Sequence, residues 1–394
     1  MSALVVFSHL RWDFVFQRPQ QLMSRFALQD KIVFIEEPVF DADSNFVDIS
    51  SPCPNVQVFR PHTSVTSTGF HKDQMGVLSV LLNNAIQEAD MGDYCAWFYT
   101  PMALPLLEIL KPRAVIYDCM DELSAFSGAP LQLRQLEHAL LTVADLVFTG
   151  GPSLYESKRS LHPSVHCFPS AVDAQHFATG SNGANAHPEL AELGRPRLGF
   201  YGVLDERLDV ALLGAVAQAR PQWNFCMVGP VVKIDSALLP HHPNIHYYGQ
   251  RPYAELPAFL AGWDVCLMPF ALNDATRYIS PTKTLEYMAA EKPIVSTLIA
   301  DVALLYGNLV EIARTPDDFV SACERALDET ASQSSLRRHL MRQSIVSLSW
   351  DNTVKAMAQL IDMTASRGAS GSTKSASMSA SVESSLSARV LTSY

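Results

Sequence analysis

The sequence predicts an α/β protein made of two doubly wound domains. Apolar runs of four to eight residues alternate with amphipathic helix patterns along most of the 394-residue chain. Runs that are apolar throughout are typical of parallel sheets covered by helices on both faces. The runs form two series separated by a polar segment, which indicates two sheets and two cores.

The first series predicts a domain over residues 1–172. Its strands are expected at 3–7, 31–35, 56–59, 94–99, 114–117, 146–149 and 165–168. Helix patterns at 19–28 and 131–143 fall between them. The chain begins almost directly on the first apolar run, without a basic region or a cleavage site, so we expect a strand there and no signal peptide.

The second series predicts a domain over residues 197–348, after a small and polar linker at 173–196. Its strands are expected at 197–203, 224–228, 245–248, 265–268, 293–297 and 309–312, with helices at 210–218, 254–262 and 316–329. A last amphipathic helix is expected at 349–365. From 366 to 394, eleven of twenty-nine residues are serine, a composition that predicts a disordered tail.

The composition narrows the classes of function. A formal charge of −11 argues against nucleic-acid binding. The seven cysteines are scattered and form no Cys-x-x-Cys pair, so neither a zinc site nor a disulfide framework is expected, and a reducing cytoplasm fits best. No uncharged apolar stretch reaches eighteen residues, so no membrane span is expected.

The segment SPTKTLEYMAA at 280–290 carries the clearest chemistry. Pro281 suits a first helical position and Ser280 suits the N-cap before it, so a helix should begin there. Lys283 then lies in the first turn, where the helix dipole disfavours a cation unless an anion shares the site. Glu286, three residues on, shares the face of Lys283. A phosphate-binding cation beside a carboxylate for sugar hydroxyls suits a nucleotide-sugar; the alternative is a capped helix with an ordinary ion pair.

Four segments in this order resemble glycosyltransferases of the GT-B architecture, in which two Rossmann-like domains face a cleft. More narrowly, the chain is similar to bacterial family-four-type transferases that use nucleotide-sugars to build surface polysaccharides. The resemblance covers about residues 1–362. The segments are FSHLRW with QRPQQL at 7–22, YDCMDE at 117–122, FYGVLDERLD at 200–209 and SPTKTLEYMAAEKPIVST at 280–297.

This resemblance implies that the second domain holds the donor. The implied donor-binding residues are Gly202, Arg207, Ser280, Thr282, Lys283 and Glu286. Arg207 and Lys283 would share the charge of the diphosphate, and Glu286 would accept the ribose hydroxyls. The alternative for Arg207 is a surface pair with Asp205 or Asp209.

Two positions depart from the pattern of the family. Related transferases often carry a Glu eight positions before Glu286, and this chain has Tyr278 there. Asn273, Asp274 and Arg277 in the same loop are candidates to take over the sugar contacts. Glu291 stands where a Gly is usual. A left-handed residue at the end of the helix would cost Glu roughly 1 kcal/mol relative to Gly.

The first domain is expected to supply the acceptor site. His9, Arg11 and Trp12 follow the first strand at the carboxyl edge, where doubly wound sheets bind ligands. Trp12 is a candidate to stack on a sugar, and His9 to relay a proton. An inverting enzyme needs a base for the acceptor hydroxyl; Asp121 is the first candidate and Asp118 the second. A retaining enzyme can pass that proton to the departing diphosphate.

The expected partners are a nucleotide-sugar donor and a glycan or lipid-linked acceptor, with no metal and no other cofactor. Arg11, Arg18 and Arg25 are expected to form a solvated face; the alternative is peripheral contact with anionic lipid on the inner face of the membrane. Two other functions stay open, a nucleotide-sugar epimerase and a non-catalytic nucleotide-sugar sensor. An oxidoreductase is disfavoured because neither strand-to-helix turn carries Gly-x-Gly-x-x-Gly. The sequence leaves the oligomeric state open.

Overall fold

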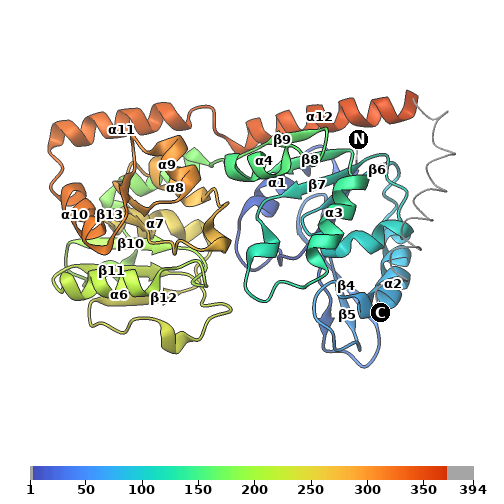
Figure 1. Cartoon of the computed structure of the whole chain (residues 1–394), viewed down its shortest axis with the longest axis horizontal. Coiled ribbons are helices and arrows are strands. Elements are labelled where there is room, and N and C mark those ends of the chain that lie inside the picture. The colour runs from blue at the N-terminus through green and yellow to red at the C-terminus, as the bar shows by residue number, and fades with distance from the viewer. Residues whose placement is uncertain (1–2, 371–394) are drawn as a thin grey trace.

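The computed structural model describes residues 3–370 and contains two α/β lobes that lie side by side (Figure 1). Each lobe is built on its own sheet, and apart from one hairpin all strand pairings are parallel. The predicted fold class is therefore confirmed. The strands of the first sheet end at Cys167 and those of the second begin at Arg197.

The first sheet has the order β3-β5-β2-β1-β6-β7-β8-β9, with β4 paired to β5 in antiparallel fashion. Its strands are β1 (Ala3–Ser8), β2 (Lys31–Glu36), β3 (Val39–Phe40), β4 (Phe46–Cys53), β5 (Val56–Thr63), β6 (Tyr94–Phe98), β7 (Val115–Cys119), β8 (Leu146–Thr149) and β9 (Val165–Cys167). Side chains alternate between the two faces of a strand, so Val5 and Phe7 pack in one core cluster while Leu4 and Val6 pack in another. This double burial explains the unbroken apolar runs.

The second sheet has the order β12-β11-β10-β13-β14-β15 and is parallel throughout. Its strands are β10 (Arg197–Tyr201), β11 (Asn224–Val228), β12 (Ile245–Gly249), β13 (Val265–Met268), β14 (Ile294–Thr297) and β15 (Glu311–Ala313). The strand order reverses between β10 and β13. In open α/β sheets ligands bind at such a switch point, beyond the carboxyl ends of the strands.

Helices cover both sheets (Figure 1). They are α1 (Arg18–Phe26), α2 (Met75–Glu88), α3 (Leu133–Val143), α4 (Pro152–Lys158), α5 (Ala174–Ala178), α6 (Val210–Ala219), α7 (Leu256–Gly262), α8 (Thr282–Ala289), α9 (Ala300–Tyr306), α10 (Pro316–Leu327), α11 (Ala331–Ile345) and α12 (Trp350–Ser370). Helix α12 packs against α1 of the first lobe, and Trp350, Met357 and Ile361 join a core cluster there. None of the described helices is both long and apolar enough to cross a membrane.

Two details differ from the sequence-based expectations, and one expected feature is present. The pair β3 and β4 was not predicted, because β4 is largely exposed and lacks an apolar run. Helix α12 continues to Ser370, so 366–370 of the predicted tail are helical, and 371–394 lie outside the described residues. The left-handed residue expected after α8 is present, since Glu291 has φ 56°; its carboxylate accepts a hydrogen bond from Arg342 at 2.6 Å.

A carboxylate of the second lobe binds the start of a helix of the first. Asp301 on α9 accepts hydrogen bonds from the backbone N–H of Ser153, at 3.1 Å, and from the Ser153 hydroxyl. Gly151 permits this approach, because a Cβ atom there would lie 2.3 Å from the carboxylate of Asp301. The two lobes are thus joined by a buried carboxylate and the amino end of α4.

We expect Asp301→Ala to shift the lobes toward a more open arrangement. Hydrogen bonds to charged groups contribute about 1.5–3 kcal/mol each, so the open population should rise at least tenfold. Spin–spin distance distributions between labels on the two lobes measure this population. Asp317→Ala, which removes an exposed carboxylate of α10, is the control. An unchanged distance distribution for Asp301→Ala would contradict the expectation.

Candidate active site

The proposed donor residues gather at the switch point of the second sheet. Gly202 follows β10 with φ 141°, and Gly229 follows β11 with φ 147°. A Cβ atom on Gly229 would lie 1.9 Å from the carbonyl oxygen of Gly202. Only glycine is compatible with both this φ region and this approach of the two backbones. The two strand ends are therefore held close together beneath the cleft.

Helix α8 begins one residue later than predicted. Pro281 is its N-cap, with ψ 122° and no side-chain hydrogen bond, so the expected cap by Ser280 is wrong. Ser280 instead faces the first lobe, where its carbonyl accepts a hydrogen bond from the Ser170 hydroxyl at 2.8 Å. The Ser170 hydroxyl also lies 3.3 Å from that of Thr282. Both residues thus border the junction between the lobes.

Lys283 extends from the first turn of α8 over Gly202. A Cβ atom on Gly202 would lie 2.7 Å from Nζ of Lys283, and Nζ lies 5.4 and 5.8 Å from the ring centroids of Phe200 and Phe270. Among residues 3–370 this ammonium has no hydrogen bond and no ion pair, so the alternative of a Lys283–Glu286 pair is wrong. Burial, with the nearby Arg207 guanidinium, lowers the pKa of Lys283 to about 8.

Glu286 is buried on the same helix. Its Oε2 accepts a hydrogen bond of 2.5 Å from the Tyr201 hydroxyl at the end of β10. Burial raises the pKa of Glu286 to about 7, although this hydrogen bond and Lys283 oppose the shift. Near neutral pH the carboxyl is therefore poised between its two protonation states.

Arg207 lies in the loop after β10 and pairs with Asp205, with Nη2 at 2.7 Å from Oδ2. The ion pair with Asp205, which was the alternative to a diphosphate contact for Arg207, is therefore present. The same guanidinium also faces the first lobe, where it lies 5.5 Å from the ring centroid of Phe126. The pair with Asp205 positions the arginine at the gap between the lobes.

Asp121 enters the same gap from the first lobe. It follows β7 and is half-buried. Burial raises the pKa of its carboxyl, and the charges of Arg207 and Lys283 oppose that shift. Thus Asp121, Arg207 and Lys283 are close enough to influence one another although they come from three distant segments.

Asp118 is not available as a base. It is fully buried, and both of its carboxylate oxygens are bound by Arg18, at 2.9 and 3.1 Å. Arg18 also donates to the carbonyl of Phe168 at 2.8 Å. The expectation of a solvated face is therefore wrong for Arg18, and Asp118 has a structural role in fixing α1 to β7.

We expect Asp118→Asn to destabilise the first lobe by about 3–5 kcal/mol, because the substitution leaves the buried Arg18 guanidinium without its counter-charge. Urea unfolding at pH 7 measures this loss. Asp121→Asn is the matched control and should change the free energy of unfolding by less than about 1 kcal/mol. Equal stability of both variants would contradict the structural role of Asp118.

His9 follows β1 at the switch point of the first sheet. Burial lowers the pKa of its imidazole to about 4, so the ring is neutral at pH 7. Its Nδ1 is buried and has no hydrogen-bond partner among the described residues. A neutral ring with an unused nitrogen can exchange a hydrogen bond with a ligand in the cleft.

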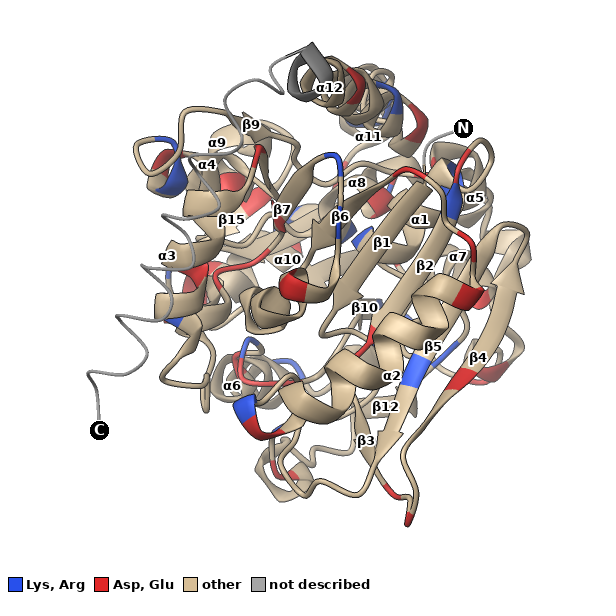
Figure 2. Ribbon diagram, turned by 90° about the vertical axis from the view of Figure 1, so that its right-hand side faces the viewer, with Lys and Arg blue, Asp and Glu red and all other residues tan. Residues whose placement is uncertain are grey.

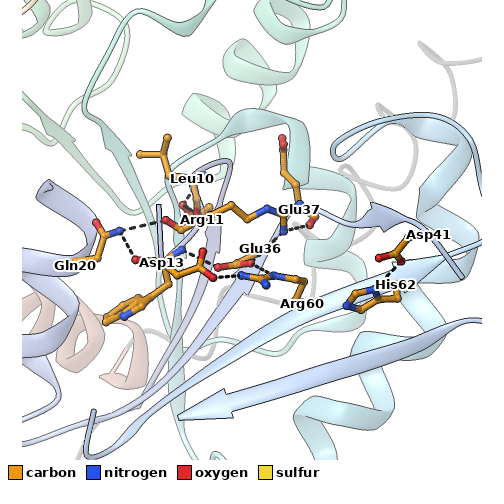
Figure 3. Close-up of polar contacts among 11 residues, drawn as sticks. Leu10, Arg11, Asp13, Gln20, Glu36, Glu37, Asp41, Arg60 and His62 are labelled. Atoms are coloured by element: carbon orange, nitrogen blue, oxygen red, sulfur yellow. Dashed lines mark hydrogen bonds and ion pairs between the residues drawn. The ribbon is translucent and has the colours of Figure 1, made fainter. Parts of the chain in front are cut away.

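Arg11 and Trp12 serve the fold rather than an open acceptor surface. Figure 3 shows Arg11 and Arg60 converging on Glu36 at the end of β2, with Nη1 of Arg11 at 3.1 Å and Nε of Arg60 at 2.7 Å from Oε2. The backbone N–H of Trp12 donates to the other carboxylate oxygen at 2.7 Å. The Trp12 ring packs edge-on to Phe34, so the predicted stacking of Trp12 on a sugar is not supported.

Glu37 is a candidate that the sequence analysis missed. Burial raises the pKa of its carboxyl to about 7, and the charges of Arg11 and Lys233 oppose the shift. Lys233 comes from the second lobe and has φ 60°. The only local signal was the Glu-Glu pair at the end of a strand. It does not show that the carboxylate of Glu36 is committed to Arg11 and Arg60 while that of Glu37 is half-buried within electrostatic reach of Lys233.

The loop before α8 does not form one sugar-binding group. Asn273 caps the short helix at Asp274–Thr276 and donates to the carbonyl of Glu206 at 3.0 Å. Asp274 and Arg277 line a separate cavity against the first lobe. Tyr278 packs on the core cluster of the first lobe, which gives the departure at this position an interdomain role.

The charge distribution offers no broad basic surface on the face drawn in Figure 2, where lysine and arginine are interspersed with acidic residues. Arg25 pairs with Asp351 at 2.8 Å and lies 3.6 Å from Asp173. Arg11 is bound to Glu36. Within residues 3–370, no three His, Cys, Asp or Glu side chains form a group that could hold a metal ion.

Known proteins share this sequence pattern. Residues 195–329 match the family model described as Glycosyl transferases group 1. Over 290 residues the chain is 27% identical to the "Putative teichuronic acid biosynthesis glycosyltransferase TuaH" of Bacillus subtilis (strain 168), covering 67% of this chain and 72% of the relative.

Solved structures share the fold across nearly the whole chain. A sucrose-phosphate synthase from Thermosynechococcus elongatus superposes with a TM-score of 0.68 at 15% identity, covering 92% of this chain and 99% of that one. A trehalose-6-phosphate structure from E. coli bound with UDP-2-fluoro glucose gives 0.67 at 14% identity, with coverage of 92% and 99%. Together, these matches show the group 1 glycosyl transferase pattern in residues 195–329 and a two-lobed GT-B fold over nearly the whole chain.

Proposed function

We propose that the chain transfers a sugar from a nucleotide diphosphate donor, held mainly by the second lobe, to a glycan or lipid-linked acceptor in surface-polysaccharide biosynthesis. The observation that carries the donor assignment is the half-buried Lys283 ammonium, which has no ion pair among the described residues and lies over Gly202. A diphosphate beside the first turn of α8 supplies the missing counter-charge. The relative named for teichuronic acid biosynthesis supports the polysaccharide context.

The donor contacts follow from this placement. Lys283 and Arg207 neutralise the diphosphate, Ser280 and Thr282 border it, and Glu286 accepts the ribose hydroxyls. The departing nucleotide diphosphate gains negative charge in the transition state, so cations aimed at it lower the barrier. Closure of the lobes excludes water and limits hydrolysis of the donor. No metal is required in this scheme.

Asp121 is the proposed base for the acceptor hydroxyl, and His9 supplies a neutral hydrogen-bonding group. Burial raises the pKa of Asp121, which makes its carboxylate a stronger proton acceptor. If the reaction retains configuration, the departing diphosphate takes the proton instead. Asp121→Asn separates the two schemes, because an inverting enzyme should lose about 10²–10⁴-fold in kcat and a retaining enzyme should lose little.

We place the reaction in the cytoplasm, where nucleotide-sugars are made. A peripheral contact with the inner face of the membrane would bring the chain to a lipid-linked acceptor. Vesicle sedimentation with and without anionic lipid tests that contact.

Thermal-shift screening against UDP-, GDP- and dTDP-sugars tests the donor assignment. A ligand that binds only the folded protein raises Tm with occupancy. We expect one nucleotide class to raise Tm for the wild type and to have little effect on Lys283→Ala and Glu286→Ala. No shift with any nucleotide, or equal shifts for all three proteins, would refute the assignment.

A further inference from the structure

A polar cavity lies between the two lobes. It has a volume of about 490 Å³, within the range of about 300–1,000 Å³ that ligand pockets occupy. Its walls come from both lobes: from residues of α3, of α4 and of the segment 122–125 in the first, and from the loop 274–278 in the second. A ligand in this cavity would touch both lobes at once.

The cavity adjoins the reacting groups along the chain on both sides. Glu122 directly follows Asp121, and the loop 274–278 is separated from Ser280 by one residue. The short helices Leu123–Ala125 and Asp274–Thr276 pack against each other. Whatever binds in the cavity therefore lies close to the acceptor side of the cleft.

Two of the lining carboxylates share a single lysine. Nζ of Lys158 lies 2.7 Å from Glu122 and 2.7 Å from Glu137. The Glu137 carboxylate also accepts the Tyr117 hydroxyl at 2.8 Å. This buried group forms the floor of the cavity and has little capacity left for a ligand.

The remaining polar lining is different. Within the described part of the chain, the side chains of Arg134, His138, Asp274 and Arg277 make no hydrogen bond and no ion pair. Over the whole lining, three carboxylates balance three basic side chains, but the guanidinium groups of Arg134 and Arg277 are not committed to any of them and are available to an anion. Guanidinium groups bind carboxylate and phosphate through two parallel hydrogen bonds.

An aromatic wall completes the cavity. The Tyr278 ring lines it and is held in place by packing on the core cluster of the first lobe. The Arg277 guanidinium lies 5.3 Å from the centroid of that ring. A fixed aromatic ring beside a fork of N–H donors suits a sugar that packs its C–H groups on the ring and carries an anionic group.

We infer that this cavity binds an acidic sugar residue of the acceptor, with its carboxylate or phosphate between Arg134 and Arg277 and its ring against Tyr278. The inference rests on the proposed function, because it extends the acceptor site of that transferase. It makes the acceptor an acidic glycan and makes Arg134, Arg277 and Tyr278 specificity-determining residues.

Titration calorimetry on the full chain tests the inference, with the nucleotide that raises Tm present throughout. The probes are tetragalacturonate, neutral maltotetraose of the same length, glucose 6-phosphate and glucose. We expect at least one acidic probe to bind, and Arg134→Gln and Arg277→Gln each to weaken it about tenfold or more. Exposed Arg314→Gln is the matched control and should bind like the wild type. Tyr278→Ala should weaken the binding of the acidic sugar probe as well.

The outcomes are separable. Arginine-dependent binding of tetragalacturonate alone indicates a carboxylate ligand, and of glucose 6-phosphate alone a phosphate ligand. Equal binding of neutral and acidic probes, equal losses for Arg314→Gln, or no binding of any acidic probe while the nucleotide still binds, would overturn the inference alone. Failure of every nucleotide to bind would instead overturn the proposed function.

Discussion

Lys283→Ala is expected to lower kcat for sugar transfer by about 10²–10³-fold, the range found when one preorganised group that stabilises transition-state charge is removed. The half-buried ammonium is held over Gly202 and beside the rings of Phe200 and Phe270. Its position therefore needs no reorganisation when negative charge develops on the leaving diphosphate. Steady-state kinetics with the identified nucleotide-sugar measure the loss, and calorimetry with the nucleoside diphosphate measures the accompanying loss of affinity.

Two controls accompany this substitution. Lys355→Ala removes an exposed ammonium on α12 and should leave turnover unchanged. Lys283→Arg keeps the charge but places a larger, forked group against Gly202, so it should recover only part of the activity. If Lys283→Ala kept more than a third of wild-type kcat, the diphosphate would have to lie elsewhere.

Glu286→Gln is expected to lower kcat/KM for the donor by about 10–100-fold and to change its pH profile. In the free wild-type enzyme the pKa of Glu286 is about 7 and that of Lys283 about 8. Below pH 7 the carboxyl is protonated and loses acceptor strength for the ribose hydroxyls, whereas above pH 8 the lysine loses its charge. The profile of kcat/KM should therefore rise toward pH 7 and fall beyond pH 8.

The variant should lose the acidic limb of this profile. The negative charge of Glu286 raises the pKa of Lys283, so its removal should also move the basic limb to lower pH. Tyr201→Phe is the matched control: it removes the hydrogen bond that favours the charged form of Glu286, and so it should shift the acidic limb upward without abolishing it. A wild-type profile flat between pH 6 and 9 would contradict the assignment of both limbs.

Much of the fold was predictable because each parallel strand is buried on both faces and so appears as an apolar run. The runs at 146–149, 224–228 and 265–268 match β8, β11 and β13 residue for residue. The hairpin strand β4 was not predicted because its side chains are mostly exposed, so its sequence carries no apolar run. The start of α8 was misplaced by one residue because Pro281 suits both the first turn and an extended cap.

The candidate site shows the same difference between what is local in the sequence and what depends on the tertiary structure. Glu286 lies three residues after Lys283 on one helix, so local periodicity alone placed the two side chains on a common face. Asp118 and Asp121 are equally close in sequence, yet one is sealed by Arg18 and the other reaches the gap between the lobes. That distinction depends on Arg18, which is 100 residues away from Asp118 in the sequence, so no local pattern could reveal it.

By itself, the sequence determined the two parallel sheets, the helix that carries the donor residues and the resemblance to transferases, because burial periodicity and short motifs are local properties. Only the tertiary structure decided which charges remain unpaired. It committed Arg11, Arg18 and Asp118 to ion pairs, left Lys283 without one among the described residues, and turned Tyr278 toward the first lobe. Pairing of charges is set by distances between segments far apart in the chain, and those distances exist only once the chain has folded.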